Sequence, residues 1–194
     1  MPNLSAFISY AFITSFTPGP NNIMSMTNAT KYGFKKSLPF NFGVFIGFFL
    51  IMLVCSFFSI TLYSLIPSIK PYMTIIGAAY ILWLAWKIFN SKPHSIDEEG
   101  KTVMGMWSAV ILQFVNVKAI LYSFTILSTF IVPYYQSWYS LLIFSVLLAF
   151  VGFASTCCWS LFGSVFQKLF IKNEKTVNVI MALLLVYCAV SLFM

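Results

Sequence analysis

A single lysine lies near the middle of an apolar stretch, residues 106–132, that is long enough to cross a lipid bilayer. Its surroundings read Gln113-Phe-Val-Asn116-Val-Lys118. An ammonium group at the centre of a bilayer costs about 2.5–3.5 kcal/mol on insertion scales, so it needs a polar partner or a polar cavity. The apolar stretches contain no Asp or Glu, which leaves Gln113, Asn116, backbone carbonyls, water or an anionic ligand as partners. The alternative is a lysine that reaches the headgroup layer or faces the carbonyls of another helix.

A second unusual motif, Thr17-Pro-Gly-Pro20, interrupts the first apolar stretch. Its two prolines lack an N–H, so the carbonyls of Thr14 and Phe16 lose their helical donors and become candidate partners for the lysine. The glycine lets the backbone turn where a Cβ would clash. Asn21 and Asn22 follow directly and are expected either to cap the second half-helix or to bind a ligand. The alternative is a proline kink that serves only helix packing.

A broken helix presents free carbonyls at one end and free N–H groups at the other, which suit an ammonium and a carboxylate respectively. A cation opposite such a break would form a pocket for a small zwitterion with both groups. The candidate substrate-binding residues are Lys118, Asn116, Gln113, Asn21, Asn22, Thr17, Pro18, Gly19 and Pro20.

The composition places these residues in a membrane. Only 8% of the 194 residues are charged and 60% are hydrophobic, whereas soluble domains carry about 25% charged residues. Backbone hydrogen bonding inside lipid requires helices, because the runs are far longer than barrel strands. We therefore expect an all-α integral membrane protein with six transmembrane helices, at about residues 4–27, 38–62, 71–89, 106–132, 138–162 and 176–193.

The lysines predict the orientation. Nine of the eleven lie in the first, third and fifth connections, and only Lys70 lies in the second. This positive-inside bias places loops one, three and five in the cytoplasm, including the loop at 91–104 with its acidic residues 97–99, and both termini in the periplasm. The net charge of +7 therefore indicates topology, and we expect membrane lipid as a partner and no nucleic acid.

The chain is expected to be one transporter domain, residues 1–194, built from two halves at about 1–90 and 105–194. Three helices per half would insert the halves in opposite senses, as an inverted repeat. The motifs Thr17-Pro-Gly-Pro20 and Val115-Asn-Val-Lys118 hold corresponding positions in the two halves. A Gly43-x-x-x-Gly47 motif in the second helix favours close helix packing, either within the chain or in a homo-oligomer.

No catalytic or cofactor signature accompanies these motifs. The sequence has no Walker loop, Ser/His/Asp set, metal-ligand cluster or paired intramembrane carboxylates, so we expect neither an enzyme nor a metal or cofactor site. Active transport would then be secondary. Coupling to protons would need Lys118 itself, a water chain or the substrate's own titration.

Two other classes of function stay open. An intramembrane thiol–disulfide redox protein would use the four cysteines, although none has C-x-x-C spacing and small packing residues are the simpler interpretation. A non-transporting membrane partner or sensor is the third alternative. The cysteines are Cys55, Cys157, Cys158 and Cys188.

The chain resembles the LysE/RhtB family of amino-acid exporters along its full length. The motifs that carry the resemblance are Phe16-Thr-Pro-Gly-Pro-Asn-Asn22, Lys31-Tyr-Gly-Phe-Lys-Lys36 and Gly77-Ala-Ala-Tyr-Ile-Leu-Trp-Leu-Ala-Trp-Lys87. The family pattern Asn-Pro-Lys reads Asn116-Val-Lys118 here, so the sequence lacks the proline that would signal a sharp second break.

Three further segments are similar to the cysteine/O-acetylserine exporter branch of that family: Gln113-Phe-Val-Asn-Val-Lys118, Leu127-Ser-Thr-Phe130 and Leu183-Leu-Leu-Val-Tyr-Cys-Ala-Val190. The resemblance implies efflux of cysteine, O-acetylserine and related small neutral amino acids. It also implies a location in a bacterial inner membrane.

Overall fold

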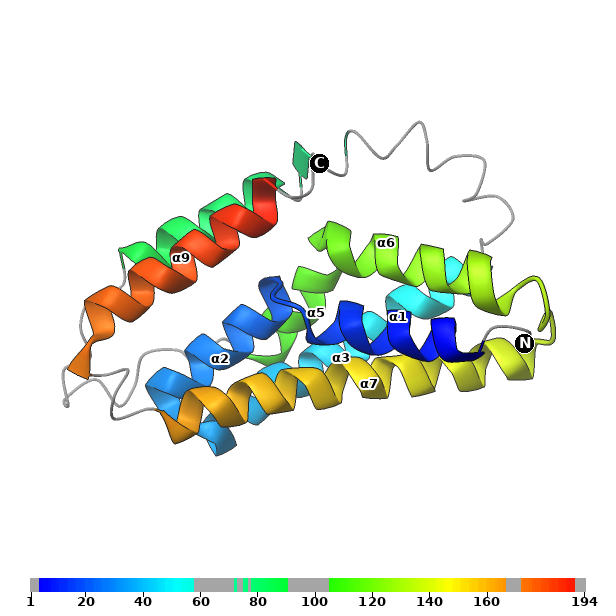
Figure 1. Ribbon diagram of the computed structural model, residues 1–194, viewed down its shortest axis with the longest axis horizontal. Helices are drawn as coiled ribbons and strands as arrows, with labels where there is room; N and C mark the ends of the chain where they lie inside the picture. Colours follow the sequence, from blue (N-terminus) through cyan, green and yellow to red (C-terminus); the bar gives the residue numbers. More distant parts are fainter. Residues whose placement is uncertain are drawn as a thin grey trace.

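The structure is a computed structural model that describes residues 4–57, 72, 75, 76, 78–90, 105–166 and 172–190, with only the backbone described for Glu174. Every regular element within these ranges is a helix, and Figure 1 shows how they lie together. The elements are α1 (Leu4–Phe16), α2 (Pro20–Tyr32), α3 (Phe34–Phe57), the helix Ala78–Phe89, α5 (Met106–Val115), α6 (Val117–Ile126), the short π-helix η1 (Leu127–Ile131), α7 (Trp138–Val165) and α9 (Glu174–Val190).

The helices have the length and composition of a membrane protein. α3 and α7 are each long and apolar enough to cross a bilayer, and α5 with α6 and η1 forms a third candidate span that is bent by 66° at its break. The expected all-helical membrane architecture is confirmed in this form. Residues 58–71 and 191–194, parts of the predicted second, third and sixth spans, lie outside the described residues.

The first predicted span is two helices, and the second of them ends later than expected. α2 runs to Tyr32, five residues beyond the predicted end, and nine of its thirteen residues are buried. It packs against α7, α3 and α9. Hydropathy underestimates the length of this helix, because its polar residues face other helices and not lipid. Its buried polar side chains are Asn22, Ser25, Asn28 and Thr30.

Apolar side chains occupy both the inside and the outside of the bundle. One buried cluster surrounds Phe40 and Leu112, and a second surrounds Met52 and Leu148. Large apolar side chains also cover the outer surface, which a lipid environment accommodates and water does not. Examples of this outer set are Phe42, Phe57, Trp107, Tyr139 and Phe150.

Two glycines bring α3 very close to α5. A Cβ added at Gly43 would overlap the backbone carbonyl of Met106, and one added at Gly47 would lie 2.7 Å from the Cγ of Gln113. The motif therefore packs within the chain, as small residues do in membrane helix pairs. The two glycines therefore set the distance between α3 and α5, the helix that carries Gln113.

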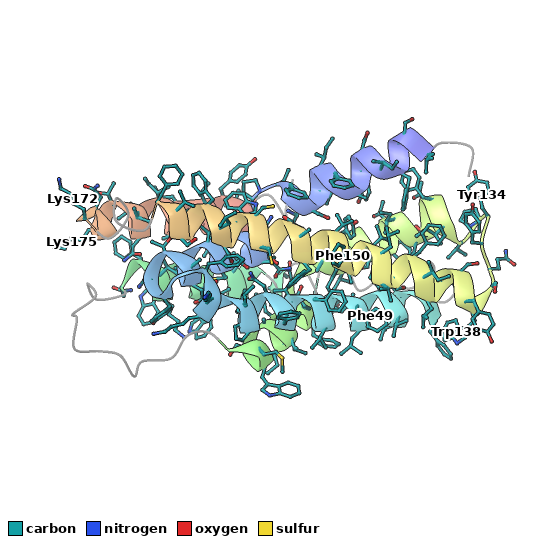
Figure 2. The ribbon with its side chains drawn as sticks, turned by 90° about the horizontal axis from the view of Figure 1, so that it is seen from below. Phe49, Tyr134, Trp138, Phe150, Lys172 and Lys175 are labelled. Carbon is teal, nitrogen blue, oxygen red and sulfur yellow. The ribbon has the colours of Figure 1, made fainter. Side chains whose placement is uncertain are left out.

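Lysines and aromatic residues mark opposite ends of the molecule. Figure 2 shows Lys172 and Lys175 at one end, and Tyr134 and Trp138 at the other. The junction of α2 and α3 lies at the same end as the start of α9 in Figure 1. The lysines predicted for the first loop lie instead on the helices themselves, because the connection is essentially Gly33 at φ 81°. They are Lys31 in the last turn of α2, and Lys35 and Lys36 in the first turn of α3.

A polar cavity between two broken helices

The first break separates α1 from α2. α1 ends at Phe16 and α2 starts at Pro20, with Gly19 in an extended conformation as its N-cap. An extended backbone is open to any residue, so the glycine is not required for its conformation. The glycine instead leaves room for Lys118, because an added Cβ would lie 3.0 Å from its Nζ and would push the ammonium away from its present position.

Lys118 reaches this break from α6. Its Nζ donates to the backbone oxygen of Thr17 at 3.1 Å, to the Thr17 hydroxyl at 2.9 Å and to the Pro18 carbonyl at 3.3 Å. The ammonium thus faces the interrupted helix, as the sequence suggests, but it uses the carbonyls of Thr17 and Pro18 and not those of Thr14 and Phe16. All three partners are neutral oxygens. The lysine's charge can therefore still attract an anion.

Side-chain donors satisfy the other carbonyls at the end of α1. The Thr17 hydroxyl donates to the carbonyl of Thr14 at 2.9 Å, and the indole N–H of Trp159 donates to that of Phe16 at 3.2 Å. The Ser15 carbonyl accepts from Asn22 and from Ser155, both at 2.8 Å. A helix end inside a membrane needs such partners, because no bulk water can supply them.

Of the two roles expected for Asn21 and Asn22, the structure excludes the capping of α2. The N-cap is Gly19, with no side-chain hydrogen bond. Asn22 turns back instead, and its Nδ2 donates to the carbonyls of Ser15 and Thr17 at 2.8 and 2.9 Å. It therefore closes the end of α1, and its amide N–H groups are already used within the protein.

The second break, between α5 and α6, forms without a proline. Asn116 has φ −82° and ψ 92°, and its side-chain oxygen accepts from the backbone N–H of Ala119 at 3.3 Å. This is an N-cap, and the cap itself ends one helix and begins the next. Val117 occupies the first helical position, where an N–H has no intrahelical acceptor and where proline is favoured. The valine therefore occupies the site without changing the geometry that proline would support.

This assignment predicts that Val117→Pro is tolerated. The substitution removes an N–H that the helix does not use, and the extended conformation of Asn116 suits a residue before proline. We expect the level of folded protein in the membrane to change by less than about two-fold. Ala119→Pro is the matched control, because it removes the N–H that donates to Asn116 and disfavours the helical conformation of Lys118, so it should lower the level of folded protein clearly. Loss of folded protein in Val117→Pro would contradict the assignment.

Amide side chains join the two breaks. Asn21 and Gln113 exchange two hydrogen bonds, at 2.9 and 3.0 Å, and Asn116 donates to the Asn21 oxygen at 3.1 Å. Gln113 is fully buried and also donates to the carbonyl of Ala109. The ends of α2, α5 and α6 are therefore fixed to one another around the lysine.

Two cavities adjoin the lysine. One has a volume of about 50 Å³ and the other about 260 Å³. Both are lined by Thr14, Pro20, Lys118 and Tyr122. At roughly 10–15 Å³ for each water-sized group, the smaller one alone holds about three to five such groups. The two together have room for a small amino acid.

The nine predicted site residues contribute to these cavities in different ways. Gly19, Asn21 and Asn116 line the smaller one, and Pro18 lines the larger. Thr17 contributes through its bonds to Lys118, while Gln113 lies behind the lining and supports Asn21. The structure thus brings all nine candidates to one place, although their contacts differ.

Sequence reasoning missed several residues of the site. Ser155 and Trp159 of α7 supply donors to the end of α1, and Tyr122 lines both cavities. Ser155 and Trp159 are four residues apart, hence on one helix face. That spacing of polar groups within an apolar helix was the available signal. Lys118 and Tyr122 share the same spacing on α6.

Interrupted helices that enclose a polar cavity within the membrane are characteristic of secondary transporters, and the fold and the site define this chain as a membrane transport protein. The family model for LysE type translocators matches residues 12–194, and the chain belongs to this family. It is 45% identical to a cysteine/O-acetylserine efflux protein of Salmonella choleraesuis and 44% identical to one of Escherichia coli. Each match covers 98% of this chain and 97% of the relative. No solved structure matches the chain significantly.

Proposed function

We propose that this protein exports small neutral amino acids, cysteine and O-acetylserine among them, from the cytoplasm by secondary transport. The observation that carries the proposal is the Lys118 ammonium, which is held by three neutral oxygens beside a cavity between two helix breaks. The names of the relatives supply the substrates, since geometry alone indicates only a small zwitterion.

Binding would proceed by exchange of partners. The substrate carboxylate pairs with Lys118 and with the backbone N–H groups of Asn21 and Asn22, which have no intrahelical acceptors in the first turn of α2. The ammonium of the substrate then takes the carbonyls of Thr17 and Pro18 that the lysine releases. Each charge on the zwitterion thereby takes over an interaction that the protein's own groups otherwise make, so neither end is left unpaired in a dry environment.

The wider architecture we propose is a single domain of six transmembrane helices in two inverted halves, with both termini in the periplasm of a bacterial inner membrane. The two broken helices support the inverted halves, because each is the first span of its half. The gathering of Lys31, Lys35, Lys36, Lys172 and Lys175 at one end supports the orientation with that end in the cytoplasm.

Uptake of labelled O-acetylserine into inverted membrane vesicles tests the function directly. Inverted vesicles expose the cytoplasmic face, so an exporter concentrates the substrate inside them. We expect uptake that depends on the protein and that rises when the vesicle lumen is acidic, as antiport of protons requires. Vesicles with the protein that take up no more than vesicles without it would refute the proposal. Uptake that does not depend on the pH gradient would refute only the coupling to protons.

A thiol–disulfide redox function would require the cysteines, whereas the proposed transport does not. None of the four cysteines forms a disulfide in the structure, and Cys55 lies in an apolar cluster. We expect a variant with Cys55→Ala, Cys157→Ser and Cys158→Ser to keep at least about half of the wild-type export, because these residues act as small packing groups. Cys188→Ser, made separately, retains a donor toward the Pro18 carbonyl. Loss of export in the triple variant, at normal membrane levels, would favour a thiol relay.

A further inference from the structure

The hydroxyl group of Tyr122 is buried near the side chain of Ser15 and makes no hydrogen bond of normal length in the described residues. Tyr122 is 4% exposed, and its oxygen is one of three buried side-chain oxygens in the described residues that make no hydrogen bond. A buried polar group without a partner costs about 1–3 kcal/mol, so a native protein keeps one where it has a use. Phenylalanine would fill the same space at no such cost.

The position of Tyr122 places its hydroxyl where a ligand bound at Lys118 can reach it. Tyr122 follows Lys118 by four residues on α6, so the two lie on one face about 6 Å apart along the axis. Both residues line both cavities, and Thr14 of the facing helix α1 lines them too. A small amino acid whose carboxylate meets Lys118 therefore extends its side chain to the level of Tyr122.

Aromatic packing holds the tyrosine ring in place. Its ring stacks on that of Tyr10 at 5.7 Å, with 8° between the planes, and contacts that of Phe48 at 5.5 Å. A ring held between α1 and α3 has little rotational freedom, so its hydroxyl is pre-organised. The Tyr122 hydroxyl is thus held at a fixed distance from Lys118. Two groups at a fixed separation favour a ligand whose own polar groups have the matching separation.

We propose that the Tyr122 hydroxyl binds the side chain of the transported amino acid and selects small amino acids with a hydrogen-bonding side chain. The inference rests on the proposed function and names the substrate class of the same site. An ester carbonyl, as in O-acetylserine, accepts a strong hydrogen bond from a phenol, and a thiol sulfur accepts a weak one. An alkyl side chain of similar length leaves the hydroxyl without a partner and is disfavoured.

Tyr122→Phe tests this inference, because it removes one oxygen and keeps the ring. In inverted vesicles we expect the KM for O-acetylserine to rise about 3- to 10-fold, the value of one net hydrogen bond, with little change in maximal rate. The KM for cysteine should rise less. Inhibition of O-acetylserine uptake by norvaline, which has no polar side-chain atom, should be unchanged or stronger.

The thermal stability of the purified variant separates binding from structure. Since the hydroxyl makes no hydrogen bond of normal length in the described residues, its removal should leave the Tm unchanged or raise it. Tyr135→Phe is the matched control, as it deletes a tyrosine hydroxyl in a packing position outside both cavities and should leave every KM unchanged.

Three results would overturn the inference. These are an unchanged KM for O-acetylserine, an equal loss for O-acetylserine and norvaline, or a lowered Tm with a general loss of transport. Each of them presupposes that the wild-type protein transports O-acetylserine. Absence of transport by the wild type would instead refute the proposed function, so the two failures are distinguishable.

Discussion

Lys118→Met is expected to reduce export of O-acetylserine by at least about 30-fold while the protein stays in the membrane. Methionine keeps an unbranched side chain with similar helix propensity and removes the ammonium group together with its hydrogen bonds. Loss of one partner from a buried charge pair costs about 2–5 kcal/mol, which gives this factor at its lower limit. The folded protein should lose little stability, because Asn22 and Cys188 still donate to the Thr17 and Pro18 carbonyls, and burying an ammonium within a membrane is itself costly. Uptake by inverted vesicles, normalised to the amount of protein, measures the effect.

The matched control for this substitution is Lys87→Met. Lys87 lies on the helix Ala78–Phe89 with its ammonium 5.2 Å from the centre of the Trp83 ring, and it lines neither cavity beside Lys118. We expect its export to remain near the wild-type value. If Lys118→Met exported at the wild-type rate, the exchange of partners proposed at the helix break would be excluded, and another group would have to hold the carboxylate.

The sequence alone is sufficient to predict those residues of the site that are energetically costly within a bilayer. A lysine within an apolar stretch and two prolines within a predicted helix are costly in lipid wherever they point, so residue type alone marks Lys118 and Pro18. The same penalty makes the apolar spans recognisable. These expectations need no knowledge of which helices are neighbours.

The parts that could not be predicted depend on neighbours. Asn22 adjoins the start of α2, where a cap is expected, yet it faces the end of α1 because the break brings those carbonyls within reach. Which carbonyls Lys118 binds depends on the approach of α6, and Ser155 matters only because α7 passes the end of α1. The break at Asn116 gives a weak signal because a capping residue inside an apolar run resembles any buried asparagine.

The two helix breaks are connected in a way that bears on mechanism. Lys118 of α6 binds the end of α1, while Asn21 of α2 binds Gln113 of α5 and Asn116 at the second break. A displacement of either broken helix therefore changes the geometry on both sides of the cavity. A substrate bound to Lys118 and to the Thr17 and Pro18 carbonyls, as proposed, would act on both breaks at once, and such contacts can shift a conformational equilibrium where they differ between its two states.

Gly43→Leu is expected to have the largest effect on the folded protein. A Cβ at this position would overlap the Met106 carbonyl, and a backbone group cannot move aside as a flexible side chain can. Helix α5 would have to shift, at a cost of about 1–3 kcal/mol or more for overpacking, and it would carry Gln113 and the amide bonds to Asn21 with it. We expect a lowered Tm in detergent, less protein in the membrane, and less export per molecule that remains. Gly105→Ala, where nothing lies within 4 Å of an added Cβ, should change the Tm little. An unaltered Tm for Gly43→Leu would mean that α3 and α5 do not pack this closely, and the support for Gln113 would then require another explanation.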